Sequence, residues 1–297
     1  MDYPAKILLL GEYGIIFDSM ALAIPYERFS GQIRTTKKLS SVEVGSNNEL
    51  KKLLSYFKDN ISRFQFINIE LFEEEIDQGL YFDSSILYGA GLGSSGALTA
   101  AVYKRYLFKT PQNNYQLMRM DLAAIESCFH GKSSGFDPLV SLLKKPLLLE
   151  AQSSIISIID LSAFIDSYTI FLINTHSTGN TGALVNVFME RCQNQEFRNY
   201  IDNEYIPIIN QTIGAVLNSD FISFDHLISK YSLFQLSHFK TMIPQYMRSY
   251  FEYGIESGEY TLKLCGSGGG GYILGIARNR LKAEAYFNLN HLDWMVV

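Results

Sequence analysis

Two glycine-rich segments of the sequence have the composition of loops that hold an anion. The first glycine segment, residues 89–96, reads GAGLGSSG, and the second glycine segment, residues 263–271, reads KLCGSGGGG. Glycine permits backbone angles that turn several N–H groups toward one anion, and a following helix adds the partial positive charge of its N-terminus. Ser94 and Ser95 add hydroxyl groups that can bond a phosphate or approach a metal. The first segment therefore predicts a phosphate-binding loop.

The second glycine segment predicts a close approach of the backbone to a ligand or to another loop, because one hairpin turn does not need four consecutive glycines. Neither segment fits a common nucleotide motif. Residues 89–96 lack the Gly-Lys-Ser/Thr ending of a Walker A loop. They also lack the third glycine and the strand–helix–strand context of a dinucleotide fingerprint. The structural explanations would be a simple strand-to-helix turn for the first segment and a flexible surface loop for the second.

The elements that must position these loops do not alternate regularly. Apolar runs predict strands at residues 5–10, 15–17, 21–24, 64–71, 146–150, 168–174, 260–264 and 271–277. Helical spacing predicts helices at residues 48–58, 97–108, 117–129, 183–191, 206–217, 224–239 and 245–253. Such a mixture favours an α+β protein over a doubly wound sheet. The pattern restarts near Ser167, so we expect two lobes, residues 1–165 and 166–297, with a ligand cleft between them.

Composition and charge argue against several classes of protein. Among 297 residues, 25 Lys and Arg stand against 30 Asp and Glu without a basic run, which disfavours nucleic-acid binding. Cys128, Cys192 and Cys265 lie far apart in the sequence, which disfavours a zinc site. No apolar run reaches the ~18 residues of a membrane span and no signal peptide is recognised, so we expect a cytoplasmic protein without a membrane partner. A homodimer is compatible with the sequence, which does not fix the oligomeric state.

Three segments, in order along the chain, resemble the signature motifs of the GHMP kinases, a family named for galactokinase, homoserine kinase, mevalonate kinase and phosphomevalonate kinase. They are residues 4–13 (PAKILLLGEY), 89–95 (GAGLGSS) and 263–271 (KLCGSGGGG). Two more segments, residues 130–137 (HGKSSGFD) and 179–185 (GNTGALV), resemble the mevalonate kinases within that family. The resemblance implies an N-terminal lobe like domain 2 of ribosomal protein S5 and a ferredoxin-like C-terminal lobe. It also implies transfer of the ATP γ-phosphoryl group to a small-molecule hydroxyl, with mevalonate, a hydroxy acid, as the leading substrate.

The resemblance also implies roles for individual residues in phosphoryl transfer. Asp137 is expected to orient or deprotonate the substrate hydroxyl, and Lys6 to supply a cation near the transferring group. A lysine that precedes the apolar run 7–10 also needs a partner if it is buried. Ser95 and Glu126 are expected to bind Mg²⁺, which prefers oxygen ligands. The residues assigned to the phosphates of ATP are Gly89, Ala90, Gly91, Leu92, Gly93, Ser94 and Ser95.

Further residues are assigned to the substrate and to loop structure. The expected substrate residues are Glu12, Tyr13, His130 and Thr181. The glycines expected to shape the second segment are Gly266, Gly268, Gly269 and Gly270. Each assignment has a structural alternative: a turn residue for Asp137, a solvent-facing strand edge for Lys6, an exposed helix residue for Glu126 and helix capping for Ser95. His130 could equally be a packed histidine, and Thr181 a helix cap.

The sequence departs from the mevalonate kinase pattern at four positions. Tyr13 replaces a histidine, Ser133 a proline, Gly96 an alanine and Gly179 an arginine. The changes at 13 and 179 fall on the expected substrate side, so another GHMP kinase, such as one acting on phosphomevalonate, stays a candidate. A decarboxylase of the same superfamily and a catalytically inactive binding protein stay candidates too. The matches at Lys6 and Glu126 favour a true kinase.

Overall fold

The computed structural model describes residues 1–109, 114–131, 133–151, 155–179 and 181–297. The chain forms two compact units that interleave along the sequence. Unit 1 consists of Met1–Lys6, Pro25–Leu87 and Gly93–Lys145, and unit 2 consists of Ile7–Ile24, Tyr88–Leu92 and Pro146–Val297. These units are not sequential halves of the chain, and the lobes expected at residues 1–165 and 166–297 stay a prediction.

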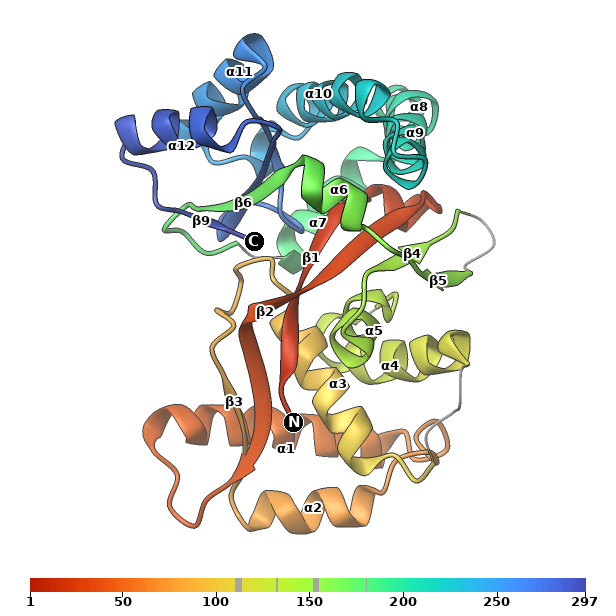
Figure 1. Ribbon diagram of the computed structural model, residues 1–297. Helices are drawn as coiled ribbons and strands as arrows, with labels where there is room; N and C mark the ends of the chain where they lie inside the picture. Colours follow the sequence, from red (N-terminus) through yellow and green to blue (C-terminus); the bar gives the residue numbers. More distant parts are fainter. Residues whose placement is uncertain (110–113, 132, 152–154, 180) are drawn as a thin grey trace. The chain divides into compact units, whose positions relative to one another are not determined.

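Strands and helices are mixed without regular alternation, which confirms the α+β class (Figure 1). In the described part of the chain, one sheet has the order β1-β2-β4-β5, with β3 also paired to β2. Its strands are β1 (Tyr3–Leu10), β2 (Ala21–Thr35), β3 (Leu80–Ser84), β4 (Leu147–Leu149) and β5 (Ile156–Ile158). The other sheet has the order β7-β8-β6-β9. Its strands are β6 (Thr169–Asn174), β7 (Thr261–Leu264), β8 (Tyr272–Ala277) and β9 (Trp294–Val296).

Unit 1 combines an antiparallel pair of strands with a group of helices. The second half of β2 pairs antiparallel with β3, so that Gly31 lies opposite Ser84 and Thr35 opposite Leu80. The helices are α1 (Ser41–Asp59), α2 (Ile69–Asp77), α3 (Ser94–Tyr106), α4 (Tyr115–His130) and α5 (Phe136–Leu143). Helix α3 packs against both α4 and α5 (Figure 1). Its fully buried Ala97 and Ala100 allow close packing, which positions the start of α3 beside its neighbours.

Unit 2 is built around the antiparallel sheet β7-β8-β6-β9. Strand β8 is buried along its whole length, and it pairs with β6 from Thr169 opposite Ala277 to Asn174 opposite Tyr272. The helices are α6 (Ser162–Ser167), α7 (Thr181–Arg191), α8 (Gln195–Tyr200), α9 (Ile206–Leu217), α10 (Phe221–His238), α11 (Arg248–Ser257) and α12 (Arg280–Leu289). The short helical turns are η1 (Gly14–Phe17), η2 (Ile201–Tyr205), η3 (Lys240–Met242) and η4 (Gln245–Met247). The η2 turn is π-helical and joins α8 to α9.

Two strands predicted from the sequence are wrong. Residues 15–17 form the η1 turn, and residues 64–71 form turns followed by the start of α2. The side chain of Asn68 accepts a hydrogen bond from the backbone N–H of Leu71 at 3.1 Å, and this cap starts the helix. Phe64 and Ile67 are buried, but the segment pairs only through an isolated bridge between Ile67 and Leu107 and forms no strand.

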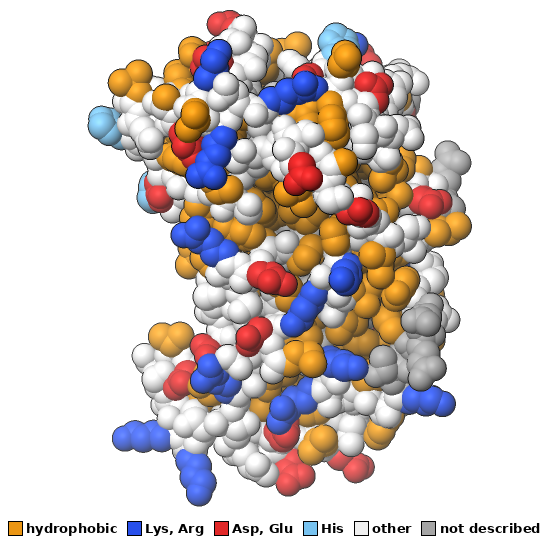
Figure 2. All heavy atoms as spheres, viewed as in Figure 1, with side chains coloured by type: hydrophobic (Ala, Val, Ile, Leu, Met, Phe, Trp, Pro, Cys, Tyr) orange, Lys and Arg blue, Asp and Glu red, His pale blue; other side chains and the backbone are white. Residues whose placement is uncertain are grey.

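The surface carries both signs of charge. On the face drawn in Figure 2, lysine and arginine side chains are interspersed with aspartate and glutamate. Some of the basic side chains are paired, as in Arg34 with Asp83 at 2.9 Å and Arg278 with Asp225 at 2.8 Å. Within the described residues, no helix combines the length and the hydropathy that crossing a membrane would require.

Candidate active site

Lys6 and Asp137 form an ion pair within unit 1. The Nζ atom of Lys6 lies 2.7 Å from Oδ2 of Asp137, and the two side chains are 4% and 35% exposed. Lys6 comes from the apolar strand β1, whereas Asp137 lies in the first turn of α5, where the helix dipole favours a carboxylate. The pair therefore places a partly accessible carboxylate beside a cation that is shielded from water.

Glu126 on α4 is a buried carboxylate close to this pair. Its side chain accepts hydrogen bonds from the hydroxyl of Ser95 at 3.2 Å and from the hydroxyl of Ser133. Burial, and to a lesser degree the charge of Asp137, raise the pKa of Glu126 to about 7 in spite of these hydrogen bonds. A carboxylate in this environment is stabilised by an added positive charge. The side chains that meet here offer hard oxygen atoms, the ligand type that Mg²⁺ prefers.

The start of α3 lies next to the Lys6 side chain. Gly93 precedes the helix with φ 74°, and a Cβ atom there would lie 2.7 Å from Cγ of Lys6. Glycine is therefore required both by the left-handed backbone and by the space. The first turn of a helix presents backbone N–H groups that the helix itself does not use, together with a partial positive charge. Ser94 and Ser95 stand in this turn, beside Lys6, at a position suited to an anion.

The first half of the glycine segment, Gly89–Leu92, packs within unit 2 against the second glycine segment. Gly91 has φ 81°, and a Cβ atom there would lie 2.3 Å from the carbonyl oxygen of Cys265. The N–H of Tyr272 donates to the carbonyl of Ala90 at 3.3 Å. The two glycine segments are thus in direct backbone contact, which is the close approach to another loop expected of the second segment.

Glu12 and Tyr13 are buried, and their polar groups have partners inside unit 2. Glu12 is 2% exposed and forms an ion pair with Lys263. Tyr13 is 5% exposed, and its hydroxyl donates to the carbonyl oxygen of Ser267 at 2.6 Å. Burial, reinforced by the charge of Glu12, raises the pKa of the Tyr13 phenol well above its ordinary value. Their assignment to the substrate stays a prediction, and these contacts give both residues a structural role.

The side chains of His130 and Thr181 lie outside the described part of the structure. The backbone places His130 at the end of α4 and Thr181 at the start of α7. Their expected roles at the substrate stay predictions.

Two residues at these sites were missed in the sequence. Lys263 stands between Leu262 and Leu264 in a buried strand, the same signal that singled out Lys6. Ser133 was noted only as a departure from a family pattern. Its hydroxyl donates to Glu126 and accepts a hydrogen bond from the N–H of Gly135 at 2.9 Å. A serine at this position supplies a hydrogen bond that proline cannot give.

A hollow in unit 2 contains none of the residues singled out in the sequence. Aromatic side chains including Tyr168 line it, and two charge pairs lie among its lining residues. These are Arg278 with Asp225 at 2.8 Å and Lys282 with Glu259 at 3.9 Å. Since each cation is paired with a carboxylate, the hollow does not have the surplus positive charge that a triphosphate would need.

Comparison with known proteins matches part of the chain to a family model and all of it to a known fold. The family model for the N-terminal domain of GHMP kinases matches residues 49–145. The mevalonate kinase of L. major, solved with R-mevalonate, is 16% identical with a TM-score of 0.67, covering 97% of this chain and 89% of that one. The Streptococcus pneumoniae phosphomevalonate kinase, solved with phosphomevalonate and AMPPNP, is 13% identical with a TM-score of 0.68, covering 100% and 99%.

A third similar structure carries a different ligand. The Lactococcus lactis galactokinase, solved with galactose, is 15% identical with a TM-score of 0.65, covering 99% of this chain and 92% of that one. No curated protein matches this chain in sequence. At these identities the solved structures share the fold, and they do not separate one substrate from another. Residues 49–145 thus match the N-terminal domain of the GHMP kinases, and the chain shares the α+β fold of these kinases over its whole length.

Proposed function

We propose that this GHMP-type kinase transfers the γ-phosphoryl group of ATP to the hydroxyl of mevalonate, giving 5-phosphomevalonate and ADP. The observation that carries the proposal is the Lys6–Asp137 pair at 2.7 Å, with the Asp137 carboxylate still 35% exposed. Phosphoryl transfer requires positioning and neutralisation of charge more than covalent chemistry by the protein. A carboxylate for the acceptor, a cation for the phosphate and a helix N-terminus occur together in unit 1.

Each side chain has a separate task in the proposed reaction. The accessible Asp137 carboxylate accepts the hydrogen bond of the acceptor hydroxyl and takes its proton as the bond to phosphorus forms. Lys6, whose ammonium group is already oriented by Asp137, stabilises the negative charge on the transferring group. The backbone N–H groups at the start of α3 bind phosphate oxygens. Because Lys6 is held by its partner before the reaction, it needs little reorganisation.

Glu126 and Ser95 are the residues that would hold Mg²⁺ in this proposal. The Ser95 hydroxyl oxygen lies 3.2 Å from a carboxylate oxygen of Glu126. The nearby charge of Asp137 contributes to the raised pKa of Glu126. In the described residues, no three His, Cys, Asp or Glu side chains form a ligand cluster. Two protein oxygens supplemented by phosphate oxygens and water suit Mg²⁺, which keeps several waters. When bound, the ion would neutralise charge on the phosphates and bring them into line with the acceptor.

Mevalonate is proposed as the acceptor on two grounds, one from the sequence and one from charge. Residues 130–137 and 179–185 resemble segments of mevalonate kinases. Phosphomevalonate carries more negative charge and would call for additional Lys or Arg in the pocket. Gly179, where mevalonate kinases have arginine, argues against that acceptor.

An acceptor panel tests the proposal. The purified chain with ATP and Mg²⁺ would be assayed for ADP release with mevalonate, phosphomevalonate, galactose and homoserine, and the product confirmed by mass spectrometry. We expect the highest kcat/KM with mevalonate, and a kcat lower by about 10³–10⁴ in Asp137→Asn prepared in parallel, which controls for a contaminating kinase. A higher kcat/KM with another alcohol would identify that alcohol, and not mevalonate, as the preferred acceptor. ADP release with none of them, despite binding of Mg²⁺–ATP, would favour an inactive binding protein.

A further inference from the structure

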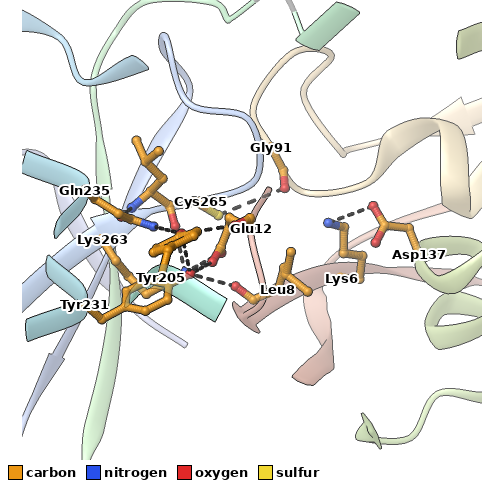
Figure 3. Close-up of polar contacts among 11 residues, drawn as sticks. Lys6, Leu8, Glu12, Gly91, Asp137, Tyr205, Tyr231, Gln235, Lys263 and Cys265 are labelled. Atoms are coloured by element: carbon orange, nitrogen blue, oxygen red, sulfur yellow. Dashed lines mark hydrogen bonds and ion pairs between the residues drawn. The ribbon is translucent and has the colours of Figure 1, made fainter. Parts of the chain in front are cut away.

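A sealed network of polar side chains lies inside unit 2 (Figure 3). Its five members are each exposed by 2% or less: Glu12, Tyr205, Tyr231, Gln235 and Lys263. They come from the residues after β1, from the η2 turn, from α10 and from β7. These side chains are buried together and bond mainly to one another and to the backbone, so the network calls for a different explanation from the Lys6–Asp137 pair with its exposed carboxylate.

The central charge pair has its hydrogen-bonding capacity used within the protein. Besides the carboxylate of Glu12, the ammonium group of Lys263 donates to the carbonyls of Leu264 at 2.7 Å and Leu8 at 3.2 Å. These three acceptors account for all three N–H donors of a lysine. The second carboxylate oxygen of Glu12 accepts from the hydroxyl of Tyr231 at 2.6 Å. Burying two charges is costly unless geometry and hydrogen bonds are this complete.

The tyrosines extend the network as neutral donors. Burial raises the pKa of both Tyr205 and Tyr231 well above the ordinary value, so both hydroxyls keep their protons. The Tyr205 hydroxyl lies 3.0 Å from the carbonyl oxygen of Glu12. A π-helical turn, which is rare and often marks a functional position, sets Tyr205 at this place.

The network, together with Tyr13 next to Glu12, holds the second glycine segment at residues 264 and 267. The side-chain oxygen of Gln235 accepts a hydrogen bond from the N–H of Leu264 at 2.8 Å, at the end of β7. Tyr13, the neighbour of Glu12, donates to the carbonyl of Ser267 at 2.6 Å. Between these two points lies Cys265, whose carbonyl oxygen closely approaches Gly91 of the first glycine segment.

We propose that the sealed network positions the nucleotide loop: it fixes residues 264–267 and, through Cys265, holds Gly89–Leu92 in a conformation that binds phosphate. The proposal rests on the proposed function, since ATP is the ligand that this loop would hold. Glu12 and Tyr13 then act through the loop, as positioning residues. The network should therefore affect the binding of ATP more than the chemical step.

Tyr231→Phe is the informative variant, because it removes one donor to Glu12 and keeps the packed ring. We expect it to raise the KM for ATP about tenfold, the effect of one charged hydrogen bond, while kcat and the KM for the acceptor stay within about twofold. Tyr168→Phe is the matched control in the same unit. Tyr168 is 5% exposed, and its hydroxyl donates to Asp225 at 2.7 Å outside the network. An equal rise of the KM for ATP in both variants would overturn the proposal.

Hydrogen–deuterium exchange provides a readout that does not depend on catalysis. The N–H groups of Gly269 and Gly271 donate to the carbonyls of Met242 and Ser177, each at 2.6 Å. We expect peptides covering residues 264–272 to exchange about tenfold faster in Tyr231→Phe than in the wild type. In Tyr168→Phe their exchange rate should equal that of the wild type. Unchanged exchange in Tyr231→Phe would overturn the positioning role. If the wild type phosphorylates no alcohol while Tyr231→Phe still exchanges faster, the proposed function fails and the positioning role stands.

Discussion

The protein contains two buried lysines that are each paired with a carboxylate (Figure 3). The two pairs differ in the solvent exposure of that carboxylate. In unit 1, Lys6 is 4% exposed while its partner Asp137 is 35% exposed. In unit 2, Lys263 and Glu12 are 0% and 1% exposed. An accessible carboxylate can exchange its partner for a substrate, whereas a sealed one can only hold structure. The comparison separates a group suited to chemistry from one suited to positioning, although each pair joins a lysine to a carboxylate.

The largest effect on the stability of the protein is expected from loss of the buried Lys263–Glu12 pair. Lys263→Met would leave the charge of Glu12 buried without its partner, so we expect the free energy of unfolding to fall by about 3–5 kcal/mol. Urea denaturation followed by circular dichroism measures this change. A loss below about 1 kcal/mol is the range of an exposed ion pair, and it would contradict the structural role given to the Lys263–Glu12 pair.

The same substitution in unit 1 should act mainly on catalysis. Lys6→Met leaves Asp137 in a position that water can reach, so its charge can be solvated. We expect kcat to fall by about 10²–10³, as for the loss of one group that stabilises transition-state charge. In the same urea experiment, the loss of stability should be clearly smaller than in Lys263→Met. Equal losses of stability with full kcat would assign Lys6 a structural role.

Glu126→Gln tests whether Glu126 binds Mg²⁺. It keeps the shape of the side chain but removes the charge that would bind Mg²⁺. We expect the Mg²⁺ concentration for half-maximal activity to rise about tenfold or more, since one ligand charge is lost. Titration of activity with Mg²⁺ at saturating ATP measures it. If the Mg²⁺ titration curves of Glu126→Gln and the wild type superimpose, Glu126 is not a ligand of the metal.

A smaller effect is expected from the serine that orients Glu126. Ser133→Ala removes the hydroxyl that donates to Glu126, and we expect a rise of about two- to fivefold in the same Mg²⁺ titration. Ser134→Ala is the control, because the Ser134 hydroxyl accepts from the N–H of Phe136 at 3.3 Å. If both variants shift the titration equally, the effect comes from the loop backbone and not from Glu126.

Local sequence signals predicted the accessible pair better than the sealed network. The glycine segments, Lys6 in an apolar strand and the motif around Asp137 were all visible without a structure. The pairing of Lys263 with Glu12 was not visible in the sequence, because Glu12 lies 251 residues away along the chain and its position is fixed only by packing. The tyrosines of the network were not visible either. Tyr205 and Tyr231 are two of 19 tyrosines, and nothing in their local pattern separates them from core residues.

The fold shows the same division between local and distant information. Helix α1 begins at a capping box of Ser40 and Glu43, a local signal that was overlooked. Strand β2 runs for 15 residues, and only its first four were expected as a strand. Its second half is partly exposed and pairs with β3, so its apolar pattern is weak and its structure depends on a distant partner.

The most direct test of the central claim is the turnover of Asp137→Asn. The variant keeps the size of the side chain and removes the carboxylate that would accept the proton of the substrate. With mevalonate, ATP and Mg²⁺, we expect kcat to fall by about 10³–10⁴ while the Kd for Mg²⁺–ATP stays close to wild type. The midpoint of thermal unfolding should fall only modestly, because the amide oxygen of asparagine can still accept a hydrogen bond from Lys6. Turnover within about tenfold of the wild type, on a folded variant that binds nucleotide, would contradict the assignment of the accessible pair to phosphoryl transfer.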